Sequence, residues 1–371
     1  MKKRTSSFSV ALAAVACLLW VAPARADTLT TVDVLRRLVS AYGVSGSEAP
    51  VRREVQSMLP SWAHPKTDAM GNLVLDVGHG SPSLLFIAHM DEIGYYVTGI
   101  TPDGYLRVEP AGGFWPGTFE GRLVLIHTDK GDVPGVVATK SIHLTAGEAP
   151  PVTNSSIFVD VGASSRADVD SLGIKILDTI TIRKDLTKLA GDRYAARSMD
   201  DRFGCTTLVQ AVRALDPAKL TGTVTFVWSV QEELGTRGAA AVAKSYRPDF
   251  VFPVDMFVTS DTPLETSQEA YAPIGHGTVM RALDNSNISP VDWNRRILAW
   301  AKAKGIALQI GATGGGNDGE NFWSESTLVI PFGIPIRYSH SMEVIDMRDL
   351  DSMIQIVNGL IGDGGWRTVK E

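Results

Sequence analysis

Two adjacent glutamates, Glu232 and Glu233, stand at the end of an apolar run, residues 223–231. A glycine-containing turn and an alanine-rich stretch follow, so the sequence predicts a strand, two acids, a turn and a helix. Neighbouring side chains at a strand end point in different directions. One carboxylate could therefore bind a metal while the other faces a substrate water, as a metal-dependent hydrolase requires. The alternative is a solvated pair at a turn, although two like charges beside an apolar strand are costly without a cation.

Two histidines also follow predicted strands. His89 and Asp91 close the apolar segment 83–90, where an imidazole can bind a metal and the aspartate can orient it. A lone histidine is more often structural, but the strand end and the neighbouring acids favour a ligand here. His340 follows another predicted strand, and Glu343 could bond its imidazole or cap the next element.

Three aspartates complete the set of possible ligands. Asp200 and Asp201 stand at the start of a predicted helix, where one can cap the helix and the other could bridge two metals. Asp255 interrupts the apolar strand 249–257, and a charged residue there is rarely buried without a partner. Asp261 has the context of a turn residue.

These positions supply imidazole nitrogens and carboxylate oxygens but no thiolate. Such ligands suit Zn²⁺, Co²⁺ or Mn²⁺ in a reactive site better than a structural zinc site of four cysteines. If one carboxylate bridges, the positions predict two metals roughly 3.5–4 Å apart. Each metal would take one histidine, one further acid and the shared aspartate, and the remaining acid would be the general base.

The elements that must position these residues indicate an α/β fold. From residue 198 onward, long helical patterns alternate with apolar strands. Residues 95–193 instead contain short β-branched strands separated by glycine, proline and aspartate turns. We therefore expect one α/β catalytic domain, residues 27–94 and 194–371, interrupted by a small β barrel or sandwich at 95–193.

Composition narrows the function classes. The chain has 371 residues, 44% hydrophobic and 20% charged, with a net charge of −6 and no basic run beyond the N-terminus. Nucleic acid is therefore not an expected partner. Lys2, Lys3 and Arg4, the apolar segment 10–21 and an A-x-A site ending at Ala26 are typical of a cleaved signal peptide, residues 1–26.

A cleaved signal peptide predicts an exported protein, periplasmic or secreted, that no longer contacts the membrane. An uncleaved N-terminal anchor is the alternative. Only Cys205 remains after cleavage, so no intramolecular disulfide can form, and its apolar context indicates a packed thiol.

Five of these segments, in this order, resemble the M42 family of metallo-aminopeptidases, the glutamyl-aminopeptidase and tetrahedral-aminopeptidase group. The resemblance covers most of the chain after residue 26, including parts of the predicted β insert. The matching motifs are Ala88-His-Met-Asp-Glu-Ile-Gly94, Ser198-Met-Asp-Asp-Arg-Phe-Gly204, Gln231-Glu-Glu-Leu-Gly-Thr-Arg-Gly-Ala239, Val254-Asp-Met256 and Arg337-Tyr-Ser-His-Ser-Met-Glu343.

The resemblance implies a mixed-sheet α/β catalytic domain of zinc-exopeptidase type with an inserted small β barrel that shapes the cavity and assists oligomerisation. It implies homo-oligomers, with twelve-subunit particles typical. It also makes Glu232 the general base and Asp91 the residue that supports His89. The ligands of two divalent metals, with Asp200 bridging, would be His89, Asp200, Glu233, Asp255 and His340.

Two features depart from that family. Its members are usually intracellular, whereas residues 1–26 predict export. The loop Gly314–Gly319 stands where a shorter Gly-Gly-Thr-Asp-type loop is usual, which could alter substrate choice.

The hypothesis is a dinuclear-metal aminopeptidase that removes N-terminal residues from peptides. One alternative is an endoglucanase-like glycoside hydrolase, because two carboxylates can catalyse glycoside cleavage, although that chemistry needs no histidine ligands. A related dinuclear dipeptidase, carboxypeptidase or deacylase is the other alternative.

Overall fold

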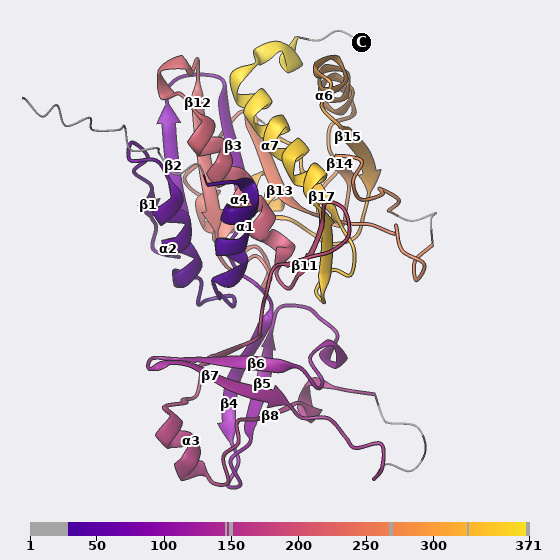
Figure 1. Ribbon diagram of the computed structural model, residues 1–371. Helices are drawn as coiled ribbons and strands as arrows, with labels where there is room; N and C mark the ends of the chain where they lie inside the picture. Colours follow the sequence, from indigo (N-terminus) through magenta and orange to yellow (C-terminus); the bar gives the residue numbers. More distant parts are fainter. Residues whose placement is uncertain (1–28, 145–146, 148–150, 267–269, 325, 369–371) are drawn as a thin grey trace, which may run out of the picture.

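The computed structural model describes residues 29–144, 147, 151–266, 270–324 and 326–368. An α/β body and a β barrel lie one above the other in Figure 1. The predicted signal peptide, residues 1–26, lies outside the described residues. Within the described residues, no helix combines the length and apolar character needed to cross a membrane.

A mixed sheet of nine strands forms the centre of the α/β body, in the order β1-β2-β12-β3-β13-β17-β14-β15 with β16 beside β13. The strands β12, β3, β13 and β17 are mutually parallel. The strand bounds are β1 Lys66–Thr67, β2 Leu73–Gly78, β3 Ser83–His89, β12 Thr223–Ser229, β13 Phe250–Val258, β14 Thr278–Leu283, β15 Leu308–Ala312, β16 Leu328–Val329 and β17 Phe332–Ile336.

Seven helices and a three-stranded sheet accompany it in the described part of the chain. The helices are α1 Thr31–Ser40, α2 Ala49–Met58, α3 Arg166–Leu172, α4 Met199–Ala214, α5 Arg237–Val242, α6 Val291–Lys304 and α7 Met347–Gly362. The small sheet contains β10 Thr187–Lys188, β11 Arg193–Ala196 and β18 Glu343–Asp346.

Both faces of the central strands are covered, which explains their nearly continuous apolar sequence. Along β3, Phe86 packs in the large cluster with α1, α4 and α7, while Leu85 and Ile87 pack in a second cluster with α5. Figure 1 shows α1, α4 and α7 on one side of the sheet. Because successive side chains of a strand point to opposite faces, β3 contributes to a hydrophobic core on each side of the sheet.

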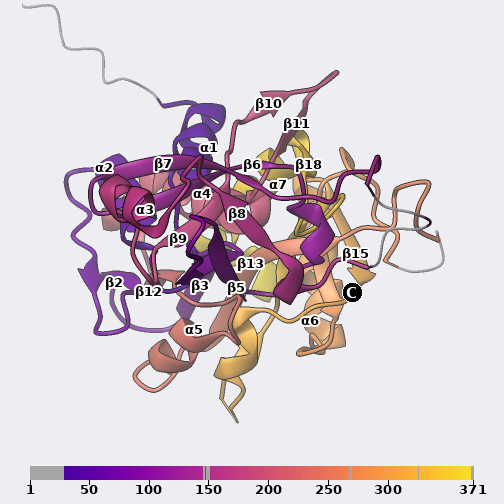
Figure 2. The same ribbon diagram turned by 90° about the horizontal axis from the view of Figure 1, so that it is seen from below.

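The inserted barrel is closed by six antiparallel strands, in the order β4-β5-β8-β7-β6-β9. Figure 2 views it from below, with β6, β7 and β8 in front of the α/β body. Its own core includes Tyr95 and Phe119, whose rings meet edge to face. The strand bounds are β4 Gly94–Ile100, β5 Leu106–Ala111, β6 Leu123–Thr128, β7 Gly131–Val137, β8 Phe158–Asp160 and β9 Thr179–Ile182.

The predicted fold class, a mixed-sheet α/β body with a small inserted β barrel, is confirmed. The domain boundaries at residues 95 and 193 stay predictions. In the turn before α2, the Ser45 hydroxyl donates a 2.6 Å hydrogen bond to the Asp91 carboxylate.

A buried network of charged residues connects the segments that join the barrel to the α/β body. The Glu92 carboxylate accepts hydrogen bonds from Lys184 Nζ at 2.7 Å and from Arg202 Nη2 at 3.1 Å. The guanidinium of Arg202 also donates to the carbonyls of Leu38 and Met90. Burial alone would raise the pKa of Glu92, but the two cations outweigh it and lower that pKa to about 2.

Replacing Glu92 by Gln should destabilise the fold by about 3–5 kcal/mol, because Lys184 and Arg202 would remain buried without a counter-charge. Since the folded pKa of Glu92 lies below its ordinary value of 4.5, its contribution is present above pH 4.5 and is lost as the pH falls towards 2. Urea unfolding at pH 7 measures the loss. The matched change Glu109→Gln, on the exposed face of β5, should cost less than about 0.5 kcal/mol, and equal costs would contradict the network.

Candidate metal centre and active site

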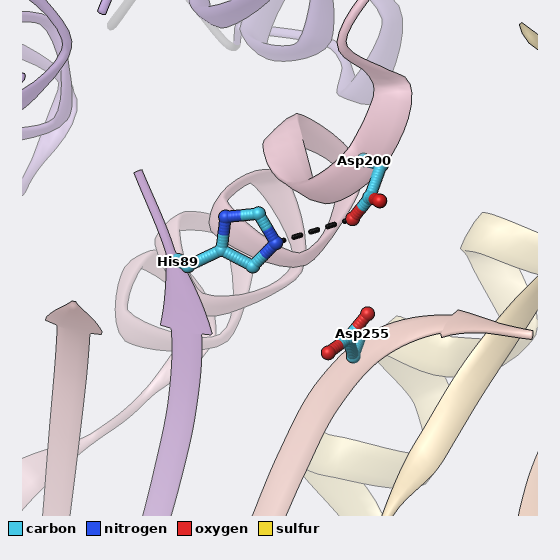
Figure 3. Close-up of side chains that lie close together, drawn as sticks. All are labelled: His89, Asp200 and Asp255. Carbon is cyan, nitrogen blue, oxygen red and sulfur yellow. Dashed lines mark hydrogen bonds and ion pairs between the residues drawn. The ribbon is translucent and has the colours of Figure 1, made fainter. Parts of the chain in front are cut away.

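The parallel strands bring the predicted site residues to one edge of the sheet. His89 ends β3, Asp255 lies in β13, and Glu232 and Glu233 directly follow β12. Asp200 begins α4, whose start faces these strand ends in Figure 3. His340 lies between β17 and β18. Strand ends and one helix start therefore converge, as expected for an open α/β sheet.

The side chains form two groups that share Asp200. In one group, ligand atoms of His89, Asp200 and Asp255 lie within 4.8 Å of one another. In the other, ligand atoms of Asp200, Glu233 and His340 do the same.

The two oxygens of the shared carboxylate face different groups. His89 Nε2 lies 3.2 Å from Asp200 Oδ1, and His340 Nε2 lies 3.3 Å from Asp200 Oδ2. Figure 3 shows the His89 imidazole and Asp200 directed at each other above Asp255. One aspartate therefore stands between two histidines, with one oxygen for each.

Hydrogen bonds fix the orientation of both histidines. The Nδ1 atom of His89 lies 3.2 Å from the carbonyl of Asp91 and 3.4 Å from its carboxylate. The same carboxylate accepts the backbone N–H groups of Glu232 and Glu233 at 3.0 and 3.2 Å. On the other side, Nδ1 of His340 pairs with the carbonyl of Gly113, which comes from the barrel.

Backbone conformations that L-residues rarely adopt gather beside the site. Ser198, Gln231 and His340 have φ of 61°, 54° and 58°, all in the left-handed region. Each adjoins or belongs to a segment that supplies one of the acids or imidazoles. Such conformations cost free energy of the order of 1–3 kcal/mol each, so their concentration at this edge is a sign of functional constraint.

The cluster contains more buried negative charge than positive charge. Burial raises the pKa of Glu233 to about 8 and that of Asp255 to about 6. The pKa of Asp200 is lowered although burial opposes this, because His340 and His89 both bond it. Burial would lower the pKa of His340, but Glu233 and Asp200 raise it to about 10.

This donor set fits divalent cations. Two imidazole nitrogens are paired with carboxylate oxygens, and the crowded carboxylates need either protons or cations to remain buried. The five predicted ligand positions are all in the two groups. Glu232 belongs to neither group, although its Oε2 lies 3.9 Å from His89 Nε2.

Of the two aspartates at the start of α4, Asp201 is the one that caps the helix, since it accepts the N–H of Gly204 at 2.9 Å. Two contacts were not predicted from the sequence. Asp201 also accepts the N–H of His89 at 3.1 Å. The counter-charge of Asp255 is Arg281, 3.6 Å away. No short sequence motif could have predicted this role of Arg281, because the residue comes from β14, an antiparallel neighbour of β17.

The acids near the loops behave differently from expectation. Glu343 bonds neither the His340 imidazole nor the next element; its carboxylate accepts the N–H groups of His340 and Met199 at 2.9 and 2.7 Å. Asp318, from the loop Gly314–Gly319, is buried and accepts the hydroxyl of Ser229. The glycine-rich loop was the only signal that could have pointed to Asp318.

The predictions for Cys205 and Asp261 had different outcomes. Cys205 is a buried, unpaired thiol, as predicted. Asp261 is more than a turn residue, since it forms a 2.5 Å ion pair with Arg337 and accepts the N–H of Ile274.

Comparisons with known proteins identify the family to which the sequence is similar. The family model described as M42 glutamyl aminopeptidase matches residues 71–356. Lysyl aminopeptidase of Pyrococcus furiosus is 31% identical over 339 residues, 89% of this chain and 96% of the relative. The putative aminopeptidase FrvX of Escherichia coli is 28% identical over 344 residues, 89% of this chain and 94% of its own length.

Solved structures agree as well. A structure titled as the PhTET1-12s dodecamer superposes with a TM-score of 0.83 at 34% identity, covering 90% of this chain and 99% of that chain. The TET1 peptidase of Pyrococcus horikoshii, described as assembling into a tetrahedron or a large octahedral shell, gives 0.84 at 33% identity, with 90% and 100% covered.

These relatives correct the prediction of export. The TET1 peptidase and the lysyl aminopeptidase match over nearly their whole length, and these homologues are cytosolic proteins. The prediction of a periplasmic or secreted protein is therefore wrong. Its basis, residues 1–26, is not among the described residues.

The charge imbalance predicts a metal-dependent stability. Without metal, the raised pKa values of Glu233 and Asp255 mean that the folded state holds protons that the unfolded state releases. Stability of metal-free protein should then fall as the pH rises from about 5 to about 8. A divalent cation at 100 times its Kd should restore about 2.7 kcal/mol.

Calorimetric melting at pH 5 and pH 8, with and without Zn²⁺ or Mn²⁺, measures this effect. Asp200→Asn should lose most of the metal-induced rise in Tm, whereas Asp292→Asn, on exposed α6, should keep it. A rise of the same size in both variants would show that the cation binds elsewhere.

Proposed function

This chain is a member of the M42 family of glutamyl aminopeptidases, and we propose that its metal-dependent aminopeptidase activity uses two divalent cations and a glutamate base. The observation that carries the proposal is the position of Asp200. Its two carboxylate oxygens face two different histidines at 3.2 and 3.3 Å, which suits one bridging ligand between two cations.

The two groups of side chains define which residues would hold the cations. His89, Asp200 and Asp255 would hold one, and Asp200, Glu233 and His340 would hold the other. The nitrogen and oxygen donors suit Zn²⁺, Co²⁺ or Mn²⁺. When bound, the cations supply Lewis acidity, which polarises the scissile carbonyl and lowers the pKa of a water.

Glu232 is the proposed general base. It is partly exposed, outside both ligand groups, and its carboxylate lies beside His89. The Asp91 carboxylate holds the Glu232 backbone N–H and the His89 ring, so one residue orients both. Glu232 would accept a proton from the attacking water and deliver it to the leaving amine.

The barrel contributes to the substrate side of the site. Gly113, Phe114 and Trp115 from the barrel, with Ser339 and His340, line a hollow of about 410 Å³. Its position against the candidate ligand His340 makes it a suitable place for the side chain of the substrate's first residue. The proposed substrates are peptides with a free N-terminus, as aminopeptidase activity requires.

Assembly into a homo-oligomer is part of the proposal. The TET structures that this chain resembles form dodecamers, tetrahedra or octahedral shells by their titles. A twelve-subunit particle is the expected size.

A glycoside hydrolase is less well supported. A Thermotoga maritima structure titled endoglucanase shares the fold at 25% identity with a TM-score of 0.73. A two-carboxylate glycosidase has no use for two histidines that flank a third acid. The site geometry favours peptide hydrolysis.

Glu232→Gln should lower kcat on an aminoacyl-nitroanilide by about 10²–10⁴-fold, because the amide cannot accept the proton. Bound metal, measured by elemental analysis after dialysis, should stay at the wild-type stoichiometry. Activity close to that of the wild type would disprove the assignment of the base.

The reaction class is tested by chelation and by blocking the substrate. EDTA should abolish hydrolysis of leucine-nitroanilide, and Zn²⁺, Co²⁺ or Mn²⁺ should restore it. N-acetylated peptides should resist cleavage, since an aminopeptidase requires the free amine. Cleavage of the blocked peptides would favour a deacylase or carboxypeptidase, and chelator-resistant hydrolysis of a glucan would favour the glycosidase.

A further inference from the structure

A cavity of about 750 Å³ lies between the barrel and the α/β body, and none of the five candidate metal ligands lines it. Its barrel wall includes Thr118, Arg122 and Leu123, and its opposite wall includes Ser341 and Met342. The hollow beside His340 is lined by residues 113–115 and 339–340. The hollow and the cavity are therefore lined by consecutive parts of the same two segments. The cavity thus lies next to the hollow at the proposed active site.

The lining of this cavity is strongly cationic. Arg122, Arg183, Lys184 and Arg197 face it, with Asp185 as the acid among the lining residues. Lys184 is already compensated, because its Nζ lies 2.7 Å from the Glu92 carboxylate. None of the three arginines forms such an ion pair within the described part of the chain.

Arg122 and Arg183 are exposed, and neither forms an ion pair with any acid in the described part of the chain. Arg197 is buried, and its Nη1 donates to the carbonyls of His340 and Ser341 at 2.8 and 3.0 Å. Both of these hydrogen bonds come from Nη1, and neither uses Nε or Nη2.

Arg197 also contacts an aromatic ring of the barrel. Its guanidinium carbon lies over the Phe119 ring, 5.1 Å from the centroid. A planar guanidinium in a fixed position is well suited to bidentate recognition of a carboxylate.

We propose that this cavity is a subsite for a carboxylate of the peptide substrate, downstream of the bond that is cleaved, with Arg122, Arg183 and Arg197 as its donors. The inference rests on the proposed aminopeptidase function, because only one residue of the substrate precedes the scissile bond and the hollow at His340 accommodates it. The carboxylate can come from an acidic side chain or from the C-terminus of a short peptide.

Matched peptides test the subsite and distinguish the two sources. The series has leucine first and alanine elsewhere, with Glu or the isosteric Gln placed at each position from one to six of a hexapeptide amide. The all-alanine version is compared as free acid and amide. At one or more positions after the first, or at the free C-terminus, kcat/KM should be about 10-fold higher with the carboxylate than with its neutral partner.

The double variant Arg122→Gln/Arg183→Gln should bring that ratio close to one, because both exposed cations are lost while the buried Arg197 is kept. Arg166→Gln, an exposed arginine of the same barrel outside the cavity, should retain the wild-type ratio. Ratios near one in the wild type, a preference confined to the first position, or a preference that the double variant keeps would each overturn the subsite.

Failure of the proposed function would look different, because no peptide of the series would then be cleaved by the metal-loaded enzyme. In that case the subsite is tested by calorimetric binding of the Glu and Gln peptides to the wild type and to the double variant. Tighter binding of the Glu peptide that the double variant loses supports the carboxylate site, and equal binding refutes it.

Discussion

The structure depends on one buried carboxylate, Asp200, held between two imidazoles and surrounded by other buried acids. Removing so many carboxylates from water is unfavourable unless protons or cations neutralise them. Histidines 89 and 340 neutralise part of this charge, and Arg281 neutralises part of that on Asp255. The remaining excess of negative charge supports our proposal that this edge of the sheet binds divalent cations.

The rest of the molecule can be understood as support for that arrangement. Asp91 ties the His89 ring to the glutamate pair, and Glu343 ties the His340 loop to the start of α4. The barrel participates directly, because a Gly113 carbonyl pairs with His340. The network of Glu92, Lys184 and Arg202 fastens the same barrel to the sheet. The proposed metal site and the barrel are thus connected through these hydrogen bonds and ion pairs.

The sequence predicted much of the fold, because apolar periodicity and strand-end acids are local signals. It located the strands that carry His89, Asp255 and the two glutamates, and the inserted β body. The supporting residues were harder to find. Arg281, Asp201 and Asp318 contact Asp255, His89 and Ser229, which lie 26, 112 and 89 positions away in the sequence, and no local pattern records such contacts. The export prediction failed for a related reason, since it rested on a short compositional pattern that the relatives contradict.

The central claim is that two cations share Asp200. Crystals grown with Zn²⁺ and measured on both sides of the zinc absorption edge would test it most directly. Two anomalous peaks are expected in each subunit, one beside His89 and Asp255 and one beside His340 and Glu233, with the Asp200 carboxylate between them. A single peak that leaves one group without zinc, or peaks away from Asp200, would contradict a carboxylate shared by two cations.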